Sequence, residues 1–278
     1  MNKPQILNIA HRGARSIAPE NTILAAQKAF EIGADLWELD VAMTADGEIV
    51  VLHDDTLERT SDAAHYYPDR KPWKVETFTL EEIRRLDFGS WYIETDPFNQ
   101  IASGVVTKED QQVFGDLPIP TLREALLFTQ DNKWLVNIEI KDLTGKPGDK
   151  FVVEKVVELV QRTGMTSSVI ISSFNHSYLQ RVRTAISEIR TAALVVFPDP
   201  DPIKLLKRLD AQAYNPGLET LDYDQIPQVV GNGYNVYIWT VNDEVDMKKL
   251  ISNGVSGIFT DFPQRLKSIL ESNCSAIA

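Results

Sequence analysis

The feature that most constrains the fold of this chain is an alternation of short apolar runs with helical segments, which repeats eight times. The runs expected to be strands are Ile6–Ala10, Leu36–Val41, Leu135–Ile140, Val169–Ser172, Ala192–Val196, Ala213–Asn215, Val236–Thr240 and Gly257–Thr260. The segments expected to be helices are Thr22–Ile32, Leu122–Gln130, Lys150–Arg162, Tyr178–Ile186, Pro202–Arg208, Tyr223–Val230, Glu244–Ile251 and Pro263–Leu270. Strands that are each followed by a helix form a parallel sheet covered by helices. Eight such units favour closure into a TIM (β/α)8 barrel, which typically needs about 250 residues. We therefore expect one barrel domain over residues 1–278.

One region interrupts the alternation, directly after the second strand. The pair Asp46-Gly47 is typical of a tight turn, and it precedes an apolar run that ends near His53, so a second, antiparallel strand is expected there. From residue 54 to about residue 118 the barrel pattern is missing, and we expect an insertion subdomain with one short helix near Leu80–Leu86. This stretch is rich in aromatic residues. They could form a core of their own or a lid over a substrate pocket, and both could hold.

Composition narrows the classes of partner. The net charge of −12 and the lack of a long Lys and Arg run argue against nucleic acid. The longest apolar stretch, around Thr191 to Phe197, is far shorter than the roughly 18 residues of a membrane span. The first residues lead straight into an expected strand without the apolar segment of a signal peptide, and Cys274 is the only cysteine, which fits a reducing compartment. We therefore expect a cytoplasmic protein, with a mature chain whose leader has been removed as the alternative. The oligomeric state stays open, a homo-oligomer included.

Ionisable residues gather at the predicted C-terminal ends of the first strands, where barrel enzymes place their active sites. Glu38 and Asp40 are two residues apart on one strand, so their side chains point the same way, and Glu139 lies near the end of the next barrel strand. Three carboxylates in one pocket would repel one another unless a cation lay among them. Oxygen ligands suit a hard ion, so the sequence predicts Mg²⁺ or Ca²⁺ held by Glu38, Asp40 and Glu139. A salt-bridged barrel rim is the alternative.

Two of the four histidines, His11 and His53, belong to the same group of strand ends. Imidazole titrates near 6.5 unperturbed, so we expect this pair to act as general acid and general base. Their partners in substrate binding are expected to be Arg12 and Lys141, the local cations that an anionic substrate requires.

Three further residues are candidates for substrate contact. Asn21 either caps the first helix or bonds to a ligand. Phe174 and Trp239, at strand ends, either line the pocket or belong to the core. Gly13 lets the backbone turn closely beside the pocket.

Taken together and in order, these residues resemble the glycerophosphodiester phosphodiesterase family. The matching segments are His11–Gly13, Ala18–Thr22, Glu38–Val41, Thr44–Gly47, Val51–Thr60, Ile119–Leu122, Glu139–Lys141, Ser173–Phe174, Trp239–Asn242 and Gly257–Asp261. The resemblance implies a TIM barrel that hydrolyses glycerophosphodiesters to glycerol 3-phosphate and an alcohol. It further implies a divalent metal on Glu38, Asp40 and Glu139, acid–base catalysis by His11 and His53, and phosphate binding by Arg12 and Lys141.

Two departures from the family pattern leave the substrate preference open. Arg15-Ser16 stands where the family commonly has small residues, and the stretch from Trp91 to Asp116 is longer than usual. One rival interpretation is a lysophospholipase D-type phosphodiesterase acting on lysolipids, with the aromatic insertion as a wall for the acyl chain. A second is a non-catalytic module that binds phosphodiesters. An unrelated metal-dependent aldolase or isomerase is disfavoured, because Lys141 is flanked by acids rather than by a Schiff-base environment.

Overall fold

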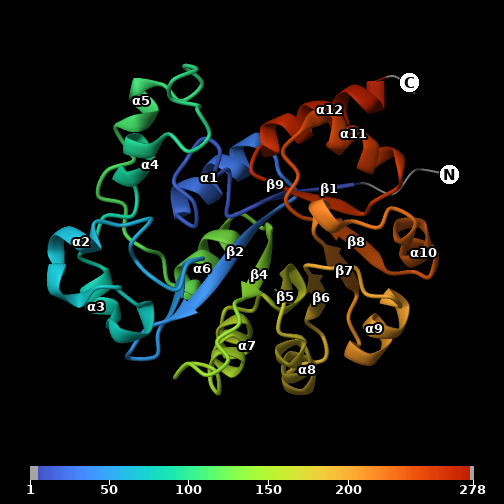
Figure 1. Cartoon of the computed structure of the whole chain (residues 1–278), viewed down its shortest axis with the longest axis horizontal. Helices are drawn as coiled ribbons and strands as arrows, with labels where there is room; N and C mark the ends of the chain where they lie inside the picture. The colour runs from blue at the N-terminus through green and yellow to red at the C-terminus, as the bar shows by residue number, and fades with distance from the viewer. Residues whose placement is uncertain (1–5, 276–278) are drawn as a thin grey trace.

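Eight parallel strands close into a barrel in the computed structural model, which describes residues 6–275. Around the barrel the strands follow the order β1-β9-β8-β7-β6-β5-β4-β2, and the pairing of β1 with β2 closes the ring. They are β1 (Leu7–Ala10), β2 (Leu36–Met43), β4 (Leu135–Ile140), β5 (Val169–Ser173), β6 (Arg190–Val195), β7 (Ala213–Pro216), β8 (Asn235–Ile238) and β9 (Gly257–Thr260). The expected TIM barrel is confirmed, the short run at Ala213 included (Figure 1).

A ninth strand, β3 (Ile49–Val51), pairs antiparallel with β2, with Val41 opposite Val51. The expected turn lies between them, where Gly47 has a φ of 81°, a conformation that glycine adopts without strain. The hairpin carries the chain back along β2, where the backbone N–H of Leu52 donates to the carbonyl oxygen of Asp40. The residues after β3 therefore lie close to the carboxylates of β2.

Helices cover the outside of the barrel because each presents an apolar face to the strands (Figure 1). In α7, for example, the valines at positions 152, 153, 156, 157 and 160 are all buried. The covering helices are α1 (Ile23–Ile32), α6 (Leu122–Asp131), α7 (Val152–Arg162), α8 (His176–Ala185), α9 (Pro202–Leu209), α10 (Gln225–Gly231), α11 (Glu244–Ser252) and α12 (Pro263–Ser275). Two 3₁₀ turns, η3 (Thr166–Ser168) and η4 (Leu218–Thr220), lie in the connections between these elements.

The barrel interior is apolar toward the N-terminal ends of the strands and polar above them. Alternate residues of a strand point to opposite faces, so Leu36, Glu38 and Asp40 of β2 share the inner face. Leu36 packs with Ile9 and Phe259 in a cluster separate from the core under the helices. On β2 the polar layer therefore begins at Glu38, two residues after Leu36. It lies at the C-terminal end of the barrel, where TIM-barrel enzymes in general have their active sites.

The segment between β3 and α6 forms a group of short helices beside the barrel (Figure 1). They are α2 (Ala63–Tyr66), η1 (Pro68–Arg70), η2 (Val75–Thr77), α3 (Leu80–Ile83), α4 (Ser90–Thr95) and α5 (Lys108–Gln111). The expectation of one short helix near Leu80 is therefore incomplete. Helices of one or two turns carry too few residues for a clear apolar period, and local caps such as the Thr107–Asp110 capping box stabilise them.

Most aromatic residues of this segment pack inward rather than toward solvent. Trp73, Phe78 and Phe88 belong to one apolar cluster, and Tyr92 and Phe114 to another. Both clusters include residues from outside the segment, such as Val50 and Ile17, so the segment is fastened to the barrel by apolar contacts.

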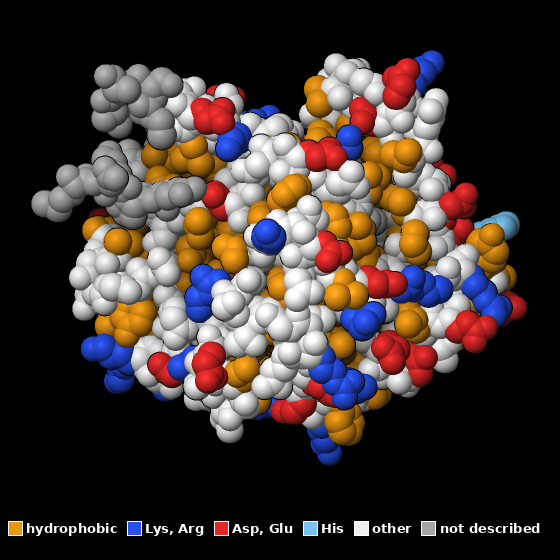
Figure 2. Space-filling view, turned by 180° about the vertical axis from the view of Figure 1, so that it is seen from behind, with side chains coloured by type: hydrophobic (Ala, Val, Ile, Leu, Met, Phe, Trp, Pro, Cys, Tyr) orange, Lys and Arg blue, Asp and Glu red, His pale blue; other side chains and the backbone are white. Residues whose placement is uncertain are grey.

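Within residues 6–275 no helix has the length and apolar character needed to cross a membrane. On the face opposite to that of Figure 1, Lys and Arg side chains alternate with Asp and Glu, and the basic side chains form no continuous patch (Figure 2).

Candidate active site

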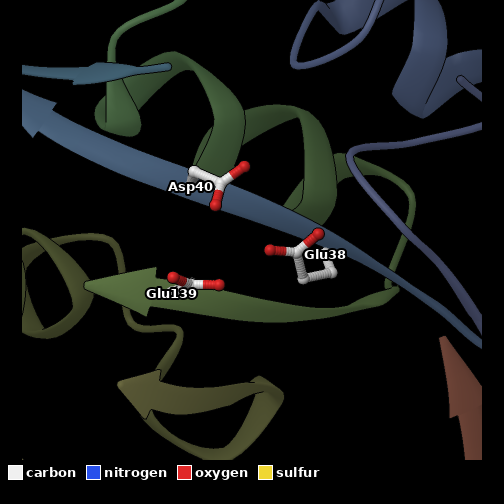
Figure 3. Close-up of side chains that lie close together, drawn as sticks. All are labelled: Glu38, Asp40 and Glu139. Carbon is white, nitrogen blue, oxygen red and sulfur yellow. The ribbon is translucent and has the colours of Figure 1, made fainter. Parts of the chain in front are cut away.

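Three carboxylates meet at the C-terminal end of β2 and β4. Asp40 and Glu139 are register partners on these strands, and Glu38 lies two residues before Asp40 on the same face. One oxygen of each carboxylate lies within 4.8 Å of the others, and Figure 3 shows the three groups turned toward a common space. The structure therefore brings together the three residues that the sequence singled out as ligands.

The chemistry of this cluster fits a hard divalent cation. Glu38 and Asp40 are only 2% and 1% exposed. Each of the three carboxylates has a buried oxygen that accepts no well-formed hydrogen bond from the described residues: Glu38 Oε1, Asp40 Oδ1 and Glu139 Oε1. Burying anionic oxygens with incomplete hydrogen bonding is costly, and an ion with a preference for oxygen ligands, such as Mg²⁺ or Ca²⁺, would compensate all three carboxylates.

The electrostatics of the cluster are divided between its members. Burial, with the charges of Asp40 and Glu139, raises the pKa of Glu38 well above its usual value. Burial and Asp40 likewise raise the pKa of Glu139. The pKa of Asp40 is lowered, because the Arg12 and Lys141 charges outweigh the effect of its burial. The protein chain alone thus does not supply enough positive charge to keep all three carboxylates ionised at low cost.

The two expected phosphate ligands, Arg12 and Lys141, lie against the same carboxylates. Lys141 Nζ is 2.8 Å from Glu139 Oε1 and 3.6 Å from Asp40 Oδ1. Arg12 Nε is 3.2 Å from Asp40 Oδ2, and the backbone N–H of Arg12 donates to Glu38 Oε2 at 2.9 Å. Both cations are therefore held at the edge of the carboxylate cluster, where an anionic substrate bound to a metal would meet them.

Each of the two candidate catalytic histidines has an aspartate on its Nδ1 atom. His11 Nδ1 lies 2.7 Å from Oδ1 of Asp261, and His53 Nδ1 lies 2.7 Å from Oδ1 of Asp54. A carboxylate on Nδ1 favours the tautomer that carries a proton there and leaves Nε2 as the atom that exchanges a proton with a ligand. Burial and the nearby Arg12 lower the pKa of His11, against the opposing effect of Asp261.

Sequence reasoning did not assign roles to these aspartates. Asp54 is adjacent to His53, and Asp261 directly follows β9, the strand that pairs with β1. Asp261 could have been found from the sequence, because it is an acidic residue directly after a predicted strand. Its distance from His11 along the chain gave no indication that the two side chains meet.

A cavity of about 120 Å³ opens beside these groups. It is lined by His11, Arg12, Glu38, His53, Asn137, Glu139, Lys141, Ser172, Phe174, Leu194, Trp239, Thr240 and Phe259. Phe174 and Trp239 form one apolar wall, with their rings edge to face and centroids 5.4 Å apart. Trp239 is fixed by a 2.8 Å hydrogen bond from its Nε1 to the backbone oxygen of Asn215. Both aromatic residues thus line the cavity, which was one of the two positions expected for them; the other was the core.

Asn21 does not cap the first helix. Thr22, not Asn21, caps α1, by accepting a hydrogen bond from the backbone N–H of Ala25. Asn21 is 3% exposed, and its Nδ2 donates to Asp40 Oδ2 at 3.0 Å. The cap alternative is therefore wrong, and the side chain of Asn21 bonds to Asp40 of the carboxylate cluster. A contact of Asn21 with a ligand stays a prediction.

The loop that carries these residues is compact around Gly13. Gly13 has a φ of 82°, and a Cβ atom there would lie 2.6 Å from the backbone carbon of Ala25 in α1. Any side chain would push α1 away from the loop, so the close turn beside the pocket requires glycine. The neighbouring Arg15 does not line the cavity, and it contacts Glu20 and Asp261 instead.

The segment from residue 54 to residue 118 contributes no side chain to the lining of this cavity. Most of its aromatic residues belong to two local apolar clusters, and none of them lines this cavity. The segment contacts the site through Asp54, which bonds to His53, and through Arg59, which bonds to Asp54.

Comparisons with known proteins agree with this geometry. Residues 11–265 match the model of the glycerophosphoryl diester phosphodiesterase family. A glycerophosphodiester phosphodiesterase from Caldanaerobacter subterraneus is 35% identical over 95% of this chain and 97% of its own. A glycerophosphodiester phosphodiesterase from Bacillus altitudinis is 33% identical over 94% of this chain and 97% of its own.

A solved structure shares the fold over nearly the full length. It is an Oleispira antarctica phosphodiesterase in complex with the product sn-glycerol-3-phosphate, with a TM-score of 0.78, 27% identity and 97% coverage of both chains. With the family model spanning the carboxylate cluster, both histidines and Asp261, the chain belongs to the glycerophosphoryl diester phosphodiesterase family.

Proposed function

We propose that this chain hydrolyses glycerophosphodiesters, such as glycerophosphocholine or glycerophosphoethanolamine, to glycerol 3-phosphate and an alcohol, with a divalent metal and a pair of histidines. The observation that carries the proposal is the presence of two imidazoles, each held by an aspartate, on one cavity with a three-carboxylate cluster. The relatives named as glycerophosphodiester phosphodiesterases, and the Oleispira structure with its product, support the same substrate class.

Glu38, Asp40 and Glu139 would hold the metal, Mg²⁺ or Ca²⁺. When bound, such an ion supplies Lewis-acid polarisation of a phosphoryl oxygen and neutralises charge that builds up there. Arg12 and Lys141 add cationic donors at the same edge of the cavity and bind the anionic oxygens.

The two histidines would move the protons of the reaction. The attacking group is the glycerol 2-hydroxyl or a water molecule, and one imidazole takes its proton at Nε2 as the new P–O bond forms. The other imidazole protonates the leaving alkoxide as its P–O bond breaks. Attack by water gives glycerol 3-phosphate directly. Attack by the 2-hydroxyl gives a cyclic phosphodiester of glycerol, and a water molecule then adds to phosphorus, gives up its proton to one imidazole and breaks the P–O2 bond, whose oxygen is protonated by the other imidazole. Asp54 and Asp261 keep Nδ1 protonated and stabilise the imidazolium formed on His53 or His11.

The cavity suits a small substrate moiety. Pockets for drug-sized ligands measure roughly 300–1,000 Å³, whereas this one measures about 120 Å³. A phosphoglycerol unit would therefore lie inside, against Phe174 and Trp239, while the head group projects from the mouth. The head group itself is not selected by any described contact.

A lysolipid is the second candidate substrate, and one observation favours it. Leu194 lines the cavity, and the residues just beyond it at the end of β6, Val196 and Phe197, are 49% and 73% exposed. These apolar side chains could meet an acyl chain outside the cavity.

A direct assay decides between the two substrates. Release of glycerol 3-phosphate from glycerophosphocholine, compared with release of choline from lysophosphatidylcholine, would be measured with each metal. We expect faster turnover of glycerophosphocholine, and a clear preference for the lipid would replace our choice. No turnover of either substrate at saturating Mg²⁺ or Ca²⁺ would remove the proposed function. We further propose a cytoplasmic location, in keeping with the single cysteine of the chain.

A further inference from the structure

Glu20 is a buried carboxylate that three arginines surround. Its side chain is 3% exposed, and it does not line the active-site cavity. Arg12 Nη1 donates to Oε1 at 2.8 Å, and Arg59 donates from Nη2 and Nη1 at 2.7 and 3.1 Å. Arg15 Nη2 lies 3.0 Å from Oε2. One anion thus neutralises part of the charge of three cations that come from two separate parts of the chain.

Each of these arginines also contacts a second carboxylate. Arg12 Nε lies 3.2 Å from Asp40 Oδ2, within the metal cluster. Arg59 donates to both oxygens of Asp54 at 2.7 and 3.0 Å, and Asp54 holds His53.

The third arginine leads to the other histidine. Arg15 Nη1 lies 3.6 Å from Asp261 Oδ1, the same oxygen that contacts His11. Glu20 is therefore linked to the site by three series of contacts, which we call branches. One runs through Arg59 and Asp54 to His53, one through Arg15 and Asp261 to His11, and one through Arg12 to Asp40.

Aromatic rings of the insertion lie against two of these arginines, Arg59 and Arg15. The guanidinium of Arg59 lies 5.7 Å from the ring centroid of Trp91, and that of Arg15 lies 5.2 Å from the ring centroid of Phe98. Cation–π contacts of this kind add attraction without competing for hydrogen bonds. The insertion, which gives no side chain to the cavity wall, is thereby connected to both histidines.

Resting on the proposed function, we propose that Glu20 is a positioning residue that sets the geometry of both histidines and of the metal cluster together. Without its charge, the three guanidiniums repel one another and turn to their second carboxylates. Arg12 then competes with the metal for Asp40. Arg59 and Arg15 lose the anchor that fixes them on the outer side of Asp54 and Asp261, so the two imidazoles are held less firmly.

The test replaces Glu20 by glutamine, which keeps the shape and removes the charge. The affinity for Ca²⁺ is measured by calorimetry on the folded protein. The values of kcat and KM are measured with glycerophosphocholine as the substrate. Loss of a group that supports metal ligands typically costs 10–100-fold in metal affinity or activity. For Glu20→Gln we expect a Kd for Ca²⁺ raised by about tenfold and a kcat lowered by about 10–100-fold, with a smaller change in KM, because Glu20 reaches the cavity only through Arg12.

The matched control is Glu154→Gln, which removes a glutamate that accepts two hydrogen bonds from Arg181 on the outside of the barrel. It should leave kcat, KM and Ca²⁺ affinity as in the wild type. A folded Glu20→Gln protein with wild-type kcat and Ca²⁺ affinity overturns the proposal.

Two further variants keep the proposal testable if Glu20→Gln does not fold. Arg59→Gln cuts the branch to His53, and Arg15→Gln cuts the branch to His11. Each should lower kcat by about tenfold while KM changes little, and wild-type kcat in both overturns the proposal. If the wild type turns over no phosphodiester, the proposed function fails, while Ca²⁺ titration still tests the role of Glu20: unchanged affinity in folded Glu20→Gln overturns it.

Discussion

The imidazole Nδ1 of His11 lies 2.7 Å from Oδ1 of Asp261, although 250 positions separate the two residues along the chain. The contact exists because β1 and β9 are neighbours where the barrel closes, and both residues follow directly at the ends of these strands. A second hydrogen bond fixes the carboxylate, since Asn242 Nδ2 donates to Asp261 Oδ2 at 2.7 Å. The orientation of His11 is therefore set by the last strand of the fold.

We predict that Asp261→Asn lowers kcat and moves the pH profile. Asp261 raises the pKa of His11, whereas burial and Arg12 lower it. Removing the negative charge therefore shifts the pKa of His11 further down, and the limb of the kcat profile that reports His11 should move to lower pH. The loss in kcat should lie within the roughly 10²–10⁴-fold range of acid–base catalysis. Asp131→Asn, at an exposed position, is the control. An unmoved profile with wild-type kcat would show that Asp261 does not act on His11.

His11→Ala and His53→Ala should each reduce turnover by about 10²–10⁴-fold, because each removes one of two proton-transfer groups. Circular dichroism should show that both variants fold, since neither side chain belongs to an apolar core cluster. His65→Ala, at an exposed position in the insertion, serves as the matched control. Near wild-type turnover in either catalytic variant would disprove the acid–base pair.

Chelation should abolish activity, and added Mg²⁺ or Ca²⁺ should restore it. The reason is that three carboxylates, from Glu38, Asp40 and Glu139, converge in a largely buried site where the nearby cations only partly neutralise their charge. The measurement is kcat after dialysis against EDTA, followed by titration with each ion. Full activity after thorough removal of divalent ions would exclude the metal from the mechanism.

Metal affinity should weaken as pH falls. Burial and neighbouring carboxylates raise the pKa of Glu38 and of Glu139 in the metal-free protein, so part of their population is protonated at pH values where an isolated glutamate is ionised. A metal requires the ionised forms, so its binding must release protons. Calorimetry in two buffers of different ionisation enthalpy measures the number released. Proton release of zero across the acidic range would contradict the raised pKa values.

Glu38→Gln should stabilise the metal-free protein at neutral pH. A carboxyl group whose pKa is raised by folding makes the folded state less stable as pH rises from its unfolded pKa through its folded one. Replacing it removes that loss, and each 1 kcal/mol corresponds to roughly 2–4 °C in Tm for a domain of ~150–250 residues. We expect a higher Tm without metal, together with loss of the Tm increase that Ca²⁺ gives the wild type. A lower Tm for the metal-free variant would refute this account.

Local periodicity is enough to predict much of this protein. The apolar runs and their helical partners indicated the barrel, because strand and helix patterns depend on near neighbours in the chain. The side-chain period of two placed Glu38 and Asp40 on one face, and parallel strands bring their C-terminal ends together, so the approach of Glu139 followed as well. The Asp46-Gly47 turn likewise predicted β3.

Other features were decided only by tertiary structure. The pairing of Asp261 with His11 requires barrel closure, and the meeting of Arg12, Arg15 and Arg59 on Glu20 requires the insertion to pack against the first loop. The short helices of the insertion have too few residues to show a period, so contacts with the barrel stabilise them. The sequence alone thus determined which side chains lie at the C-terminal end of each strand and which face they share, because both depend on the local geometry of the strand. Which distant side chains meet there depends on how the chain closes on itself.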